Sequence, residues 1–522
     1  MRLGIDFGTT RTVVATALAG RYPVAVFEAP GGYRDFVPGV ATLNDDLCFG
    51  WEAAAELGRG PRAAVRSVKR EVSRRAPDDV LSDSGLDMTA LDLATRYLSF
   101  LRSELIDRAN LDVDREEPLE AMIAVPANAG SSQRYLTVEA FRRAGFSVLG
   151  LVNEPTAAAV EYAYNNLAGL GRKSPKRYVV VYDLGGGTFD TSAVSLLERR
   201  FELIASEGIG RLGGEDFDAA ILELALSKAG VRAAALSANQ TTHLLEICRE
   251  AKEGVSSNCR RLLIDLEPAL PGVDAVTLEM SEVNRACAPL VEPTLGLLAR
   301  IVDKVKEYGI NPDNPRELGG VYLVGGATAF PLVARTLREH YRRKVLLAPL
   351  PHAATAVGLA IAADPEAGIY LREATTRHFG VWRERDAGRA KVFDPIIEKG
   401  ALPRKDGVVV TRRYRPVHAV GHLRFVECSE LGPDGEAHGD LMPWGEVLFP
   451  YDPLLSTLDN LGKVAPDARL SNPDQEIVER YNYRSDGTVC VEIQNATRGY
   501  TRRYELGHLA ERDARAAGAE PP

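Results

Sequence analysis

Short apolar runs and helical patterns alternate along the first 163 residues. Residues 1–50 hold short β-type segments separated by turns at 29–32 and 37–39. In residues 51–110, apolar side chains recur near the i, i+4 and i+7 positions of one helix face. The residues of that face are Leu91, Leu93, Tyr97, Leu98, Leu101 and Leu105. Residues 121–163 follow as strand, loop, helix, strand and helix, so the pattern predicts a mixed α/β region.

A glycine run lies between two segments of alternating β-branched residues near the middle of the chain. Tyr178–Tyr182 leads into Asp183–Asp190, and Thr191–Val194 follows it. This period-2 pattern predicts the two strands of a hairpin with a glycine turn between them. Leu3–Ala15 repeats the order of strand, Asp, Gly, Thr and returning strand. The repetition suggests two similar lobes that face each other across one cleft.

The glycine run has the chemistry of a phosphate-binding turn. Gly185–Gly187 would let an anion approach main-chain N–H groups without a Cβ in the way. Asp183 and Asp190 flank the run and favour a bridging divalent cation, and Thr188 adds a hydroxyl. A glycine-rich hairpin without a ligand is the alternative for such a run by itself. The second copy at the N-terminus favours phosphate.

Two phosphate turns on two lobes imply a nucleotide held between them. The P-loop pattern of Gly, four residues and Gly-Lys-Ser/Thr is not visible, and neither is a Rossmann G-x-G-x-x-G that leads into a helix. The paired hairpins indicate an α/β fold of the two-lobed, actin-like ATPase type, which is ribonuclease H-like.

Length and charge narrow the class of protein. With 522 residues the chain exceeds one ordinary core, so we expect two or more domains. Lys+Arg 63 against Asp+Glu 72 gives a net charge of −9, and the charges are interspersed, which argues against a nucleic-acid surface. Runs such as Val179–Tyr182 are too short to span a membrane, and Asp6 interrupts the place where a signal peptide needs its apolar core. We expect a cytoplasmic protein without a nucleic-acid or membrane partner.

The 6 cysteines include no C-x-x-C pair, which favours buried free thiols over disulfides or zinc.

Two charged residues outside the glycine turns are further candidates for the cleft. Lys69 lies in the stretch Val65–Arg70, where a lysine beside arginines is usually solvated. Glu154 directly precedes Pro155, and proline suits the first turn of a helix. Glu154 is therefore expected at a strand end near the cleft, with a helix-capping role as the alternative.

Four motifs in register resemble the 70-kDa heat-shock (DnaK-type) chaperone family. The motifs are Asn153–Ala159, Asp183–Asp190, Leu212–Asp218 and Val324–Thr328. Their order and spacing match over residues 1 to about 362, whereas sugar kinases and actins share the fold but not these strings. The resemblance implies an ATPase domain over residues 1–368 that binds ATP or ADP with Mg²⁺ and hydrolyses ATP slowly, as a timer.

The resemblance also implies roles for individual residues. Catalytic roles fall on Lys69, Glu154, Asp183, Thr188 and Asp6. Nucleotide contacts are expected from Gly8, Thr9, Thr10, Arg11, Gly185, Gly186, Gly187, Gly213, Gly214, Lys252, Ser256, Gly325, Gly326 and Ala327. Asp6, Asp183 and Asp190 would hold Mg²⁺, mainly through water, because Mg²⁺ keeps most of its waters. Lys69 would offset charge on the transferred phosphoryl, and one carboxylate would orient the attacking water.

The adenosine side departs from the family. Glu253 stands where many members carry an adenine-stacking arginine, and Ala329 replaces a second one. A guanidinium on a purine face contributes about 1 to 3 kcal/mol. We therefore expect weaker adenine affinity, which restoring both arginines would correct. Variation tolerated by the glycine backbone of Gly325–Gly326 is the alternative.

The coupling residues agree with the family only in part. Pro126 and Arg134 match the proline and arginine that relay the nucleotide state to the substrate domain. Gly150 occupies a position that often carries an arginine used in docking the J-domain co-chaperone, so a relay without that co-chaperone is expected. The linker, residues 369–375, lacks the family's acidic-flanked leucine run.

From residue 376 the composition changes to short β runs. These runs are 379–382, 408–410, 423–426, 446–449 and 489–493, and Asp486-Gly487 is a tight-turn signal. This pattern predicts a β-sandwich over residues 376–510, which resembles the family's peptide-binding domain. We expect residues 511–522 to form a flexible tail that is too short to be the family's lid. Because the lid slows peptide dissociation in the family, we expect fast peptide release. Two functions stay open: a lidless chaperone-like protein for polypeptide clients, and a nucleotide-gated scaffolding or regulatory module for one dedicated protein partner.

Overall fold

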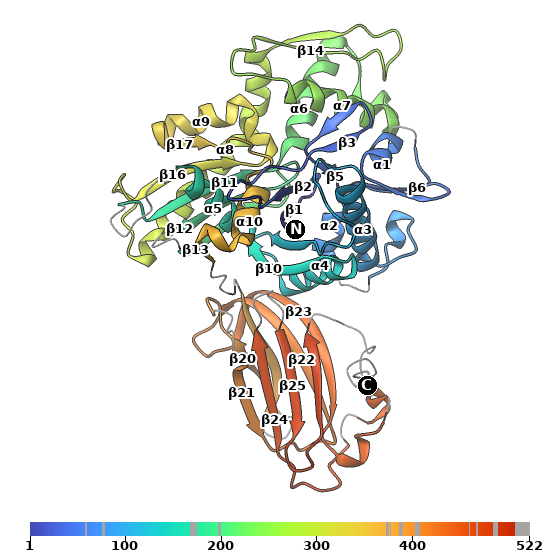
Figure 1. The fold of residues 1–522 in the computed structure, drawn as a ribbon, viewed down its shortest axis with the longest axis vertical. Helices are drawn as coiled ribbons and strands as arrows, with labels where there is room; N and C mark the ends of the chain where they lie inside the picture. Colours follow the sequence, from blue (N-terminus) through green and yellow to red (C-terminus); the bar gives the residue numbers. More distant parts are fainter. Residues whose placement is uncertain are drawn as a thin grey trace.

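Two mixed sheets with helices are followed along the chain by two antiparallel sheets, which lie below them in Figure 1. The structure is a computed structural model. It describes residues 1–57, 60–75, 79–166, 175–196, 200–371, 375, 377–385, 390–401, 408–458, 460–465, 468–483 and 489–506. The predicted Asp486-Gly487 turn and the predicted tail at 511–522 lie outside these residues.

The first sheet is built on the N-terminal hairpin. β1 (Arg2–Phe7) pairs antiparallel with β2 (Arg11–Thr16), and β9 (Glu120–Val125) runs parallel to β1 on its other side. β10 (Ser147–Asn153) and β5 (Val37–Pro38) complete the order β10-β9-β1-β2-β5. The two strands predicted around the first glycine turn are therefore confirmed.

Helices α3 (Ala90–Asp107) and α4 (Ser131–Arg143) pack against each other and share a core with this sheet. The helix face predicted from the leucine spacing is confirmed, because all of its apolar residues are buried in α3. Thr89 caps α3, since its side chain accepts a hydrogen bond from the Asp92 N–H. The Tyr97 hydroxyl donates to Thr12 Oγ1 at 2.8 Å and ties α3 to the hairpin.

The second sheet repeats the topology of the first. β11 (Tyr178–Leu184) pairs antiparallel with β12 (Phe189–Ser195), and β16 (Leu318–Val324) runs parallel to β11. The order β17-β16-β11-β12-β13-β18 is completed by β13 (Arg200–Ile209), β17 (Val345–Leu347) and β18 (Tyr370–Leu371). Every residue of β16 is buried, as expected for a central strand covered on both faces. The predicted glycine hairpin is confirmed, and both glycine turns join strands with equivalent neighbours.

Two helices that pack against each other lie between the two mixed sheets. α5 (Glu154–Asn166) packs on the second sheet, and α10 (Ala354–Ala363) packs on β1, β2 and β9 of the first. The two helices also pack on each other. A Cβ on Gly358 would lie 1.8 Å from the carbonyl oxygen of Ala157, so their backbones approach more closely there than any other residue allows.

Smaller elements surround the two sheets in the described chain. The other α-helices are α1 (Gly50–Leu57), α2 (Val68–Arg74), α6 (Gly214–Ala229), α7 (Ala238–Glu253), α8 (Met280–Lys304) and α9 (Pro331–Tyr341). The other strands are β3 (Phe27–Ala29), β4 (Gly32–Arg34), β6 (Ala41–Leu43), β7 (Leu47–Phe49), β8 (Ala63–Val65), β14 (Arg261–Ile264) and β15 (Val276–Glu279). Short 3-10 segments are η1 (Ser82–Ser84), η3 (Ala233–Ala235), η4 (Val305–Tyr308), η5 (Gly326–Ala329), η6 (Arg342–Lys344), η7 (Pro365–Ala367), η8 (Pro453–Leu455) and η9 (Leu461–Lys463).

The C-terminal part is a β-sandwich of two four-stranded antiparallel sheets around one core. One sheet has the order β20-β19-β22-β23, with β19 (His378–Arg385), β20 (Ala390–Ile397), β22 (Val420–Leu431) and β23 (Ala437–Pro450). The other has the order β21-β24-β25-β26, with β21 (Val408–Tyr414), β24 (Ile477–Tyr483), β25 (Val489–Asn495) and β26 (Thr501–Leu506). All five predicted β runs fall within these strands. Arg383 links the sheets, because it bonds Glu479 at 2.7 Å and Asp394 at 2.6 Å.

The segment predicted as a linker begins inside the second sheet. Tyr370 and Leu371 pair in parallel with Arg200 and Phe201 of β13. Residues 372–374 lie outside the described part of the chain, and the predicted domain boundaries stay a prediction.

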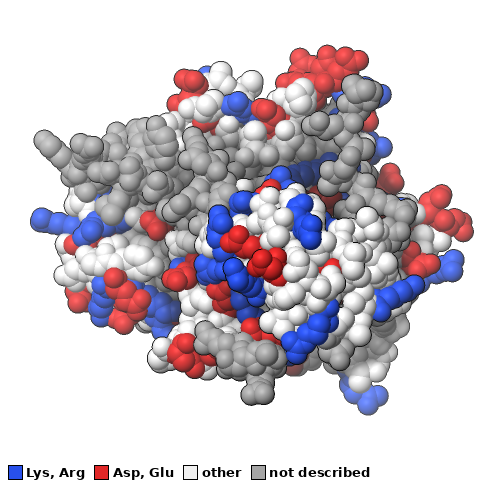
Figure 2. All heavy atoms as spheres, turned by 90° about the horizontal axis from the view of Figure 1, so that it is seen from below, with Lys and Arg blue, Asp and Glu red and all other residues white. Residues whose placement is uncertain are grey.

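Surface charges are mixed in sign (Figure 2), and most but not all of the cysteine thiols are buried. On the face that Figure 2 shows from below, Lys and Arg side chains lie among Asp and Glu side chains. All six cysteines are free; Cys248, Cys287, Cys428 and Cys490 are buried, and Cys48 and Cys259 are half-buried. None of the helices in the described ranges is long and apolar enough to span a membrane.

Candidate functional site

A cavity of about 680 Å³ lies where the two glycine turns meet. This volume is in the range of sites for nucleotide-sized ligands, roughly 300 to 1,000 Å³. The wall contains most residues that the sequence nominated. They are Asp6, Gly8, Thr9, Thr10, Arg11, Lys69, Glu154, Asp183, Gly185, Gly186, Thr188, Asp190, Gly214, Lys252, Gly325, Gly326 and Ala327. Gly187, Gly213 and Ser256 are the nominated residues outside it.

The two turns touch at Thr10 and Gly186. A Cβ on Gly186 would lie 2.1 Å from Thr10 Oγ1, so only glycine allows this approach. The β1–β2 turn is fixed from behind, since the Ser67 hydroxyl donates to the Thr9 carbonyl at 2.5 Å and the Gly39 N–H donates to the Thr10 carbonyl at 3.0 Å. The carbonyls of this turn are thus bonded away from the cavity, as an anion-binding turn requires.

The β11–β12 turn is supported by the start of α6. The Gly214 N–H donates to the Gly185 carbonyl at 2.9 Å, and the Glu215 N–H donates to the Gly186 carbonyl at 2.8 Å. A Cβ on Gly213 would lie 2.4 Å from the Gly187 nitrogen. Gly187 and Gly213 therefore shape the turn from outside the cavity wall.

Three aspartates face the cavity from the strands that carry the turns. Asp183 and Asp190 are paired across the β11–β12 ladder, and Asp6 is on β1. Gly325, at φ +83°, leaves room for Asp183, because a Cβ there would lie 2.3 Å from Asp183 Oδ1. Burial raises the pKa of Asp6 and of Asp190 to about 7 each. It also raises the pKa of Asp183 well above its usual range, with the charges of Glu154 and Asp190 adding to the effect.

The aspartates suit a hydrated divalent cation. Carboxylates crowded in a partly desolvated cavity resist ionisation, and a cation between them would remove that penalty. Among the described residues, no three His, Cys, Asp or Glu side chains are close enough together to hold a metal ion directly. Mg²⁺ keeps most of its waters in proteins, so carboxylates can also contact it through those waters.

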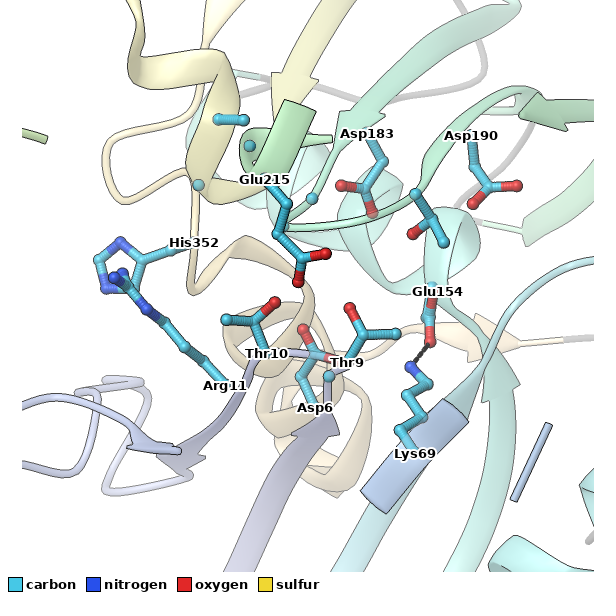
Figure 3. A pocket seen from close by; sticks show the side chains of 18 of the residues that line it. Asp6, Thr9, Thr10, Arg11, Lys69, Glu154, Asp183, Asp190, Glu215 and His352 are labelled. Atoms are coloured by element: carbon cyan, nitrogen blue, oxygen red, sulfur yellow. Dashed lines mark hydrogen bonds and ion pairs between the residues drawn. The ribbon is translucent and has the colours of Figure 1, made fainter. Parts of the chain in front are cut away.

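Lys69 and Glu154 form an ion pair at the cavity wall, on the side away from Arg11 and His352 (Figure 3). Lys69 is in the first turn of α2, where the capping Ser67 side chain accepts from the Arg70 N–H. Glu154 is the first residue of α5, ahead of Pro155, as expected. Lys69 is only 6% exposed, so the alternative of a solvated surface lysine is wrong. Burial lowers the pKa of Lys69, but the charges of Glu154 and Asp6 outweigh it, and the net shift is upward.

Lys252, near the end of α7, lines the cavity, whereas Ser256, beyond the end of α7, does not. Lys252 bonds Asp218 at 2.6 Å and donates to the Gly214 carbonyl at 2.7 Å. α7 ends at Glu253, and Gly254 takes the C-cap position. Beyond that turn Ser256 is exposed and does not line the cavity.

Other wall residues were not nominated from the sequence. Arg70 bonds Glu215 across the cavity at 3.2 Å, and His352 lies beside Arg11 in Figure 3. Gly208, at the end of β13, leaves room for Asp190, because a Cβ there would lie 2.4 Å from Asp190 Oδ1. The two glycines of Gly208-Ile209-Gly210 at a strand end were a readable signal for this position, whereas nothing local marks His352.

The wall carries groups that suit phosphate oxygens and a hydrated cation. Thr10 Oγ1 is buried without a hydrogen-bond partner in the described structure and lies at the junction of the two turns. Glycine turns that expose backbone, an ammonium group and several carboxylates together match phosphate oxygens and a hydrated cation.

Known proteins give an independent comparison. Residues 2–374 match the family described as Hsp70 protein. Similar curated proteins include the "Chaperone protein HscA homolog" of Burkholderia pseudomallei (strain 668) and of Burkholderia mallei (strain SAVP1), each 32% identical over 387 residues. The protein of that name from Burkholderia multivorans is 31% identical over 387 residues. These alignments cover 70% of this chain and 59% of each relative, so the chain spans about three fifths of the relatives' length.

Proposed function

The chain belongs to the Hsp70 family, and from that premise we propose that it is a slow ATPase whose nucleotide state controls polypeptide binding by the β-sandwich. The observation that carries this proposal is the cavity itself. Two glycine turns, three aspartates and the Lys69–Glu154 pair come from distant parts of the sequence and line one space. The equivalent topology of the two sheets supports the two-lobed, actin-like arrangement.

The phosphate chain is held by the two turns. Thr9 and Thr10 of the first and Gly185 and Gly186 of the second line the cavity. Asp6, Asp183 and Asp190 would hold Mg²⁺ through its waters, and the ion would supply positive charge beside the phosphate oxygens. The proposed role of these residues is to bind and align, which is most of the catalysis that phosphoryl transfer needs.

Lys69 and Glu154 act on the reacting end. The Lys69 ammonium, kept protonated by Glu154 and Asp6, stabilises negative charge that grows on the transferred phosphoryl group. The Glu154 carboxylate orients the attacking water by accepting a hydrogen bond from it, and Thr188 adds a hydroxyl at the same wall.

The contacts of Arg134 support coupling between this site and the rest of the molecule. Arg134 is buried, and its Nη2 donates to Asn153 Oδ1 at 2.6 Å. Asn153 immediately precedes Glu154, and Pro126 lines the same cavity. A change in the contacts of Glu154 can therefore be passed to Arg134 through Asn153 alone. This supports the predicted relay of the nucleotide state to the substrate domain.

Exposed apolar residues support polypeptide binding by the sandwich. Val417 is 43% exposed in the β21–β22 connection, and Leu454 is 78% exposed in the β23–β24 connection. The Asp452 N–H donates to the Ala419 carbonyl at 2.8 Å, so the two connections lie together at one end of the sandwich. Apolar side chains that no neighbour covers suit segments of unfolded chains.

The test combines hydrolysis with peptide binding. Purified protein should release phosphate from ATP with Mg²⁺ at a low rate, and Asp183→Asn should release little at the Mg²⁺ concentration that saturates the wild type. A fluorescent apolar peptide should bind, and ATP should weaken the binding. Capture of one folded partner, with no affinity for unrelated peptides, would favour the dedicated-partner alternative. Absence of ATP binding would contradict both functions.

A further inference from the structure

Arg11 and Glu253 bridge the cavity at the end opposite the reacting groups. Arg11 begins β2 and Glu253 ends α7, and Arg11 Nη2 lies 2.5 Å from Glu253 Oε1. Figure 3 shows Arg11 extending toward His352 and away from Lys69 and Glu154. This bridge joins the first turn, which carries Thr9 and Thr10, to the wall that carries Lys252.

The guanidinium of Arg11 is held on two sides. Its central carbon lies 4.2 Å from the centre of the Phe36 ring, which gives one face of the planar group an aromatic partner. The Glu253 carboxylate fixes the edge of the group. Next to Phe36, the Asp35 carboxylate bonds His352 at 2.8 Å, and His352 also lines the cavity. The Arg11 guanidinium is thereby held beside Glu253 and Phe36.

Other cations on this side of the cavity are bonded elsewhere. Lys252 is bonded to Asp218 and to the Gly214 carbonyl. Arg249 lines the cavity but donates to Glu246, one turn back on the same helix. Ala329 of η5 contributes no polar side chain. Among these groups, Arg11 is the guanidinium that has an aromatic ring against one of its faces.

We propose that Arg11 contacts the nucleoside part of the bound nucleotide by stacking its guanidinium on the base, and that Glu253 is the positioning residue that holds Arg11 there. This inference rests on the proposed nucleotide site and adds the source of its base selectivity. A guanidinium between an aromatic side chain and a base stabilises the base by stacking and by cation–π attraction. In this proposal Arg11 supplies the contact that Glu253 and Ala329 do not, and the expectation of weak adenine binding is revised accordingly.

The test is calorimetry with Mg²⁺ and two ligands, ATP and inorganic triphosphate. Arg11→Ala should weaken ATP binding by about tenfold and triphosphate binding much less. Arg11→Lys keeps the charge and part of the cation–π attraction but has no planar face, so its ATP affinity should stay below that of the wild type. Arg66→Ala is the matched control, because Arg66 also reaches α7, at Thr242 Oγ1 2.9 Å away, without lining the cavity. It should bind both ligands as the wild type does.

Three results would overturn the inference while leaving the proposed function in place. One is an equal loss for ATP and triphosphate in Arg11→Ala, and another is restoration of ATP affinity by lysine. The third is a selective loss of ATP in Arg249→Ala while Arg11→Ala binds normally. A wild type that binds neither ligand would instead contradict the proposed function, and the inference would fall with it.

The positioning role of Glu253 is tested by measuring the ATP affinity of Glu253→Gln with and without Arg11. Glu253→Gln should weaken ATP binding less than Arg11→Ala does. In the Arg11→Ala background the same change should have no effect, because the side chain that it positions is gone. An equal loss in both backgrounds would show that Glu253 contacts the nucleotide independently.

Discussion

Asp183 and Asp190 are directly opposite each other in the β11–β12 ladder. Directly opposed residues of an antiparallel pair place their side chains on the same face of the sheet, with Cα atoms about 4.5 to 5.5 Å apart. Both carboxylates line the cavity, and the glycine turn lies between them in the sequence. The hairpin therefore delivers two acids and a phosphate turn as one rigid unit.

The first prediction concerns this pair. Asp183→Asn keeps the size of the side chain and removes its charge, so the Mg²⁺ concentration for half-maximal ATP hydrolysis should rise by about 10- to 100-fold. Phosphate release measured over a magnesium series tests this. Asp45→Asn is the control, because Asp45 is exposed and does not line the cavity. An unaltered magnesium dependence in Asp183→Asn would contradict the metal assignment.

The second prediction concerns Lys69. Lys69→Ala should lower kcat by about a hundredfold or more and change ATP affinity by only a few-fold, because its charge acts mainly on the transition state. Single-turnover hydrolysis and calorimetry separate the two quantities, and a melting curve verifies the fold. A normal kcat with weakened ATP binding would instead assign Lys69 to ground-state binding.

The third prediction concerns a carboxylate outside the cavity. Glu161, on α5, is 3% exposed and accepts a hydrogen bond from the Tyr322 hydroxyl and another from Asn165. Burial raises the pKa of Glu161 from 4.5 to about 7, although these hydrogen bonds oppose the shift. Between those pH values the folded protein binds more protons than the unfolded chain, so the free energy of unfolding falls as pH rises.

Glu161→Gln removes this dependence. Above pH 7 the variant should be more stable than the wild type, by at most about 3 kcal/mol, and the difference should shrink toward pH 4.5. Urea unfolding at about pH 5 and about pH 8 measures it. Glu366→Gln, at an exposed position, is the control. A difference that does not vary with pH would contradict the assignment of the titration to Glu161.

The parts that could be predicted from the sequence are those encoded locally. The glycine hairpins were readable because an aspartate, the glycines and the strand pattern follow one another within about a dozen residues. The five β runs of the sandwich were readable from the change in composition after residue 376. Glu154 was readable because Pro155 marks the start of a helix.

Contacts between distant segments could not be predicted in this way. Arg11 and Glu253 are 242 residues apart, and nothing near either residue indicates that they pair. The neighbours of Lys69 are typical of a solvated surface, and its burial depends on Glu154 from another helix. Ser256 was nominated through the family resemblance, but the end of α7 at Glu253 leaves it outside the wall.

The last prediction revises the expectation that two added arginines would act together. Ala329 is exposed at the cavity wall, so Ala329→Arg can add a guanidinium there without removing a contact, and ATP binding should tighten by up to about tenfold. Glu253→Arg removes the partner of Arg11 and places a like charge beside it. That variant should bind ATP no better than the wild type.

The double variant should therefore be no tighter than Ala329→Arg alone. Calorimetry with ATP and with inorganic triphosphate distinguishes stacking from simple charge attraction, since an added charge would strengthen both ligands equally. If Glu253→Arg tightened ATP selectively, the bridge to Arg11 would have no part in base binding, because destroying the bridge would then have improved the site.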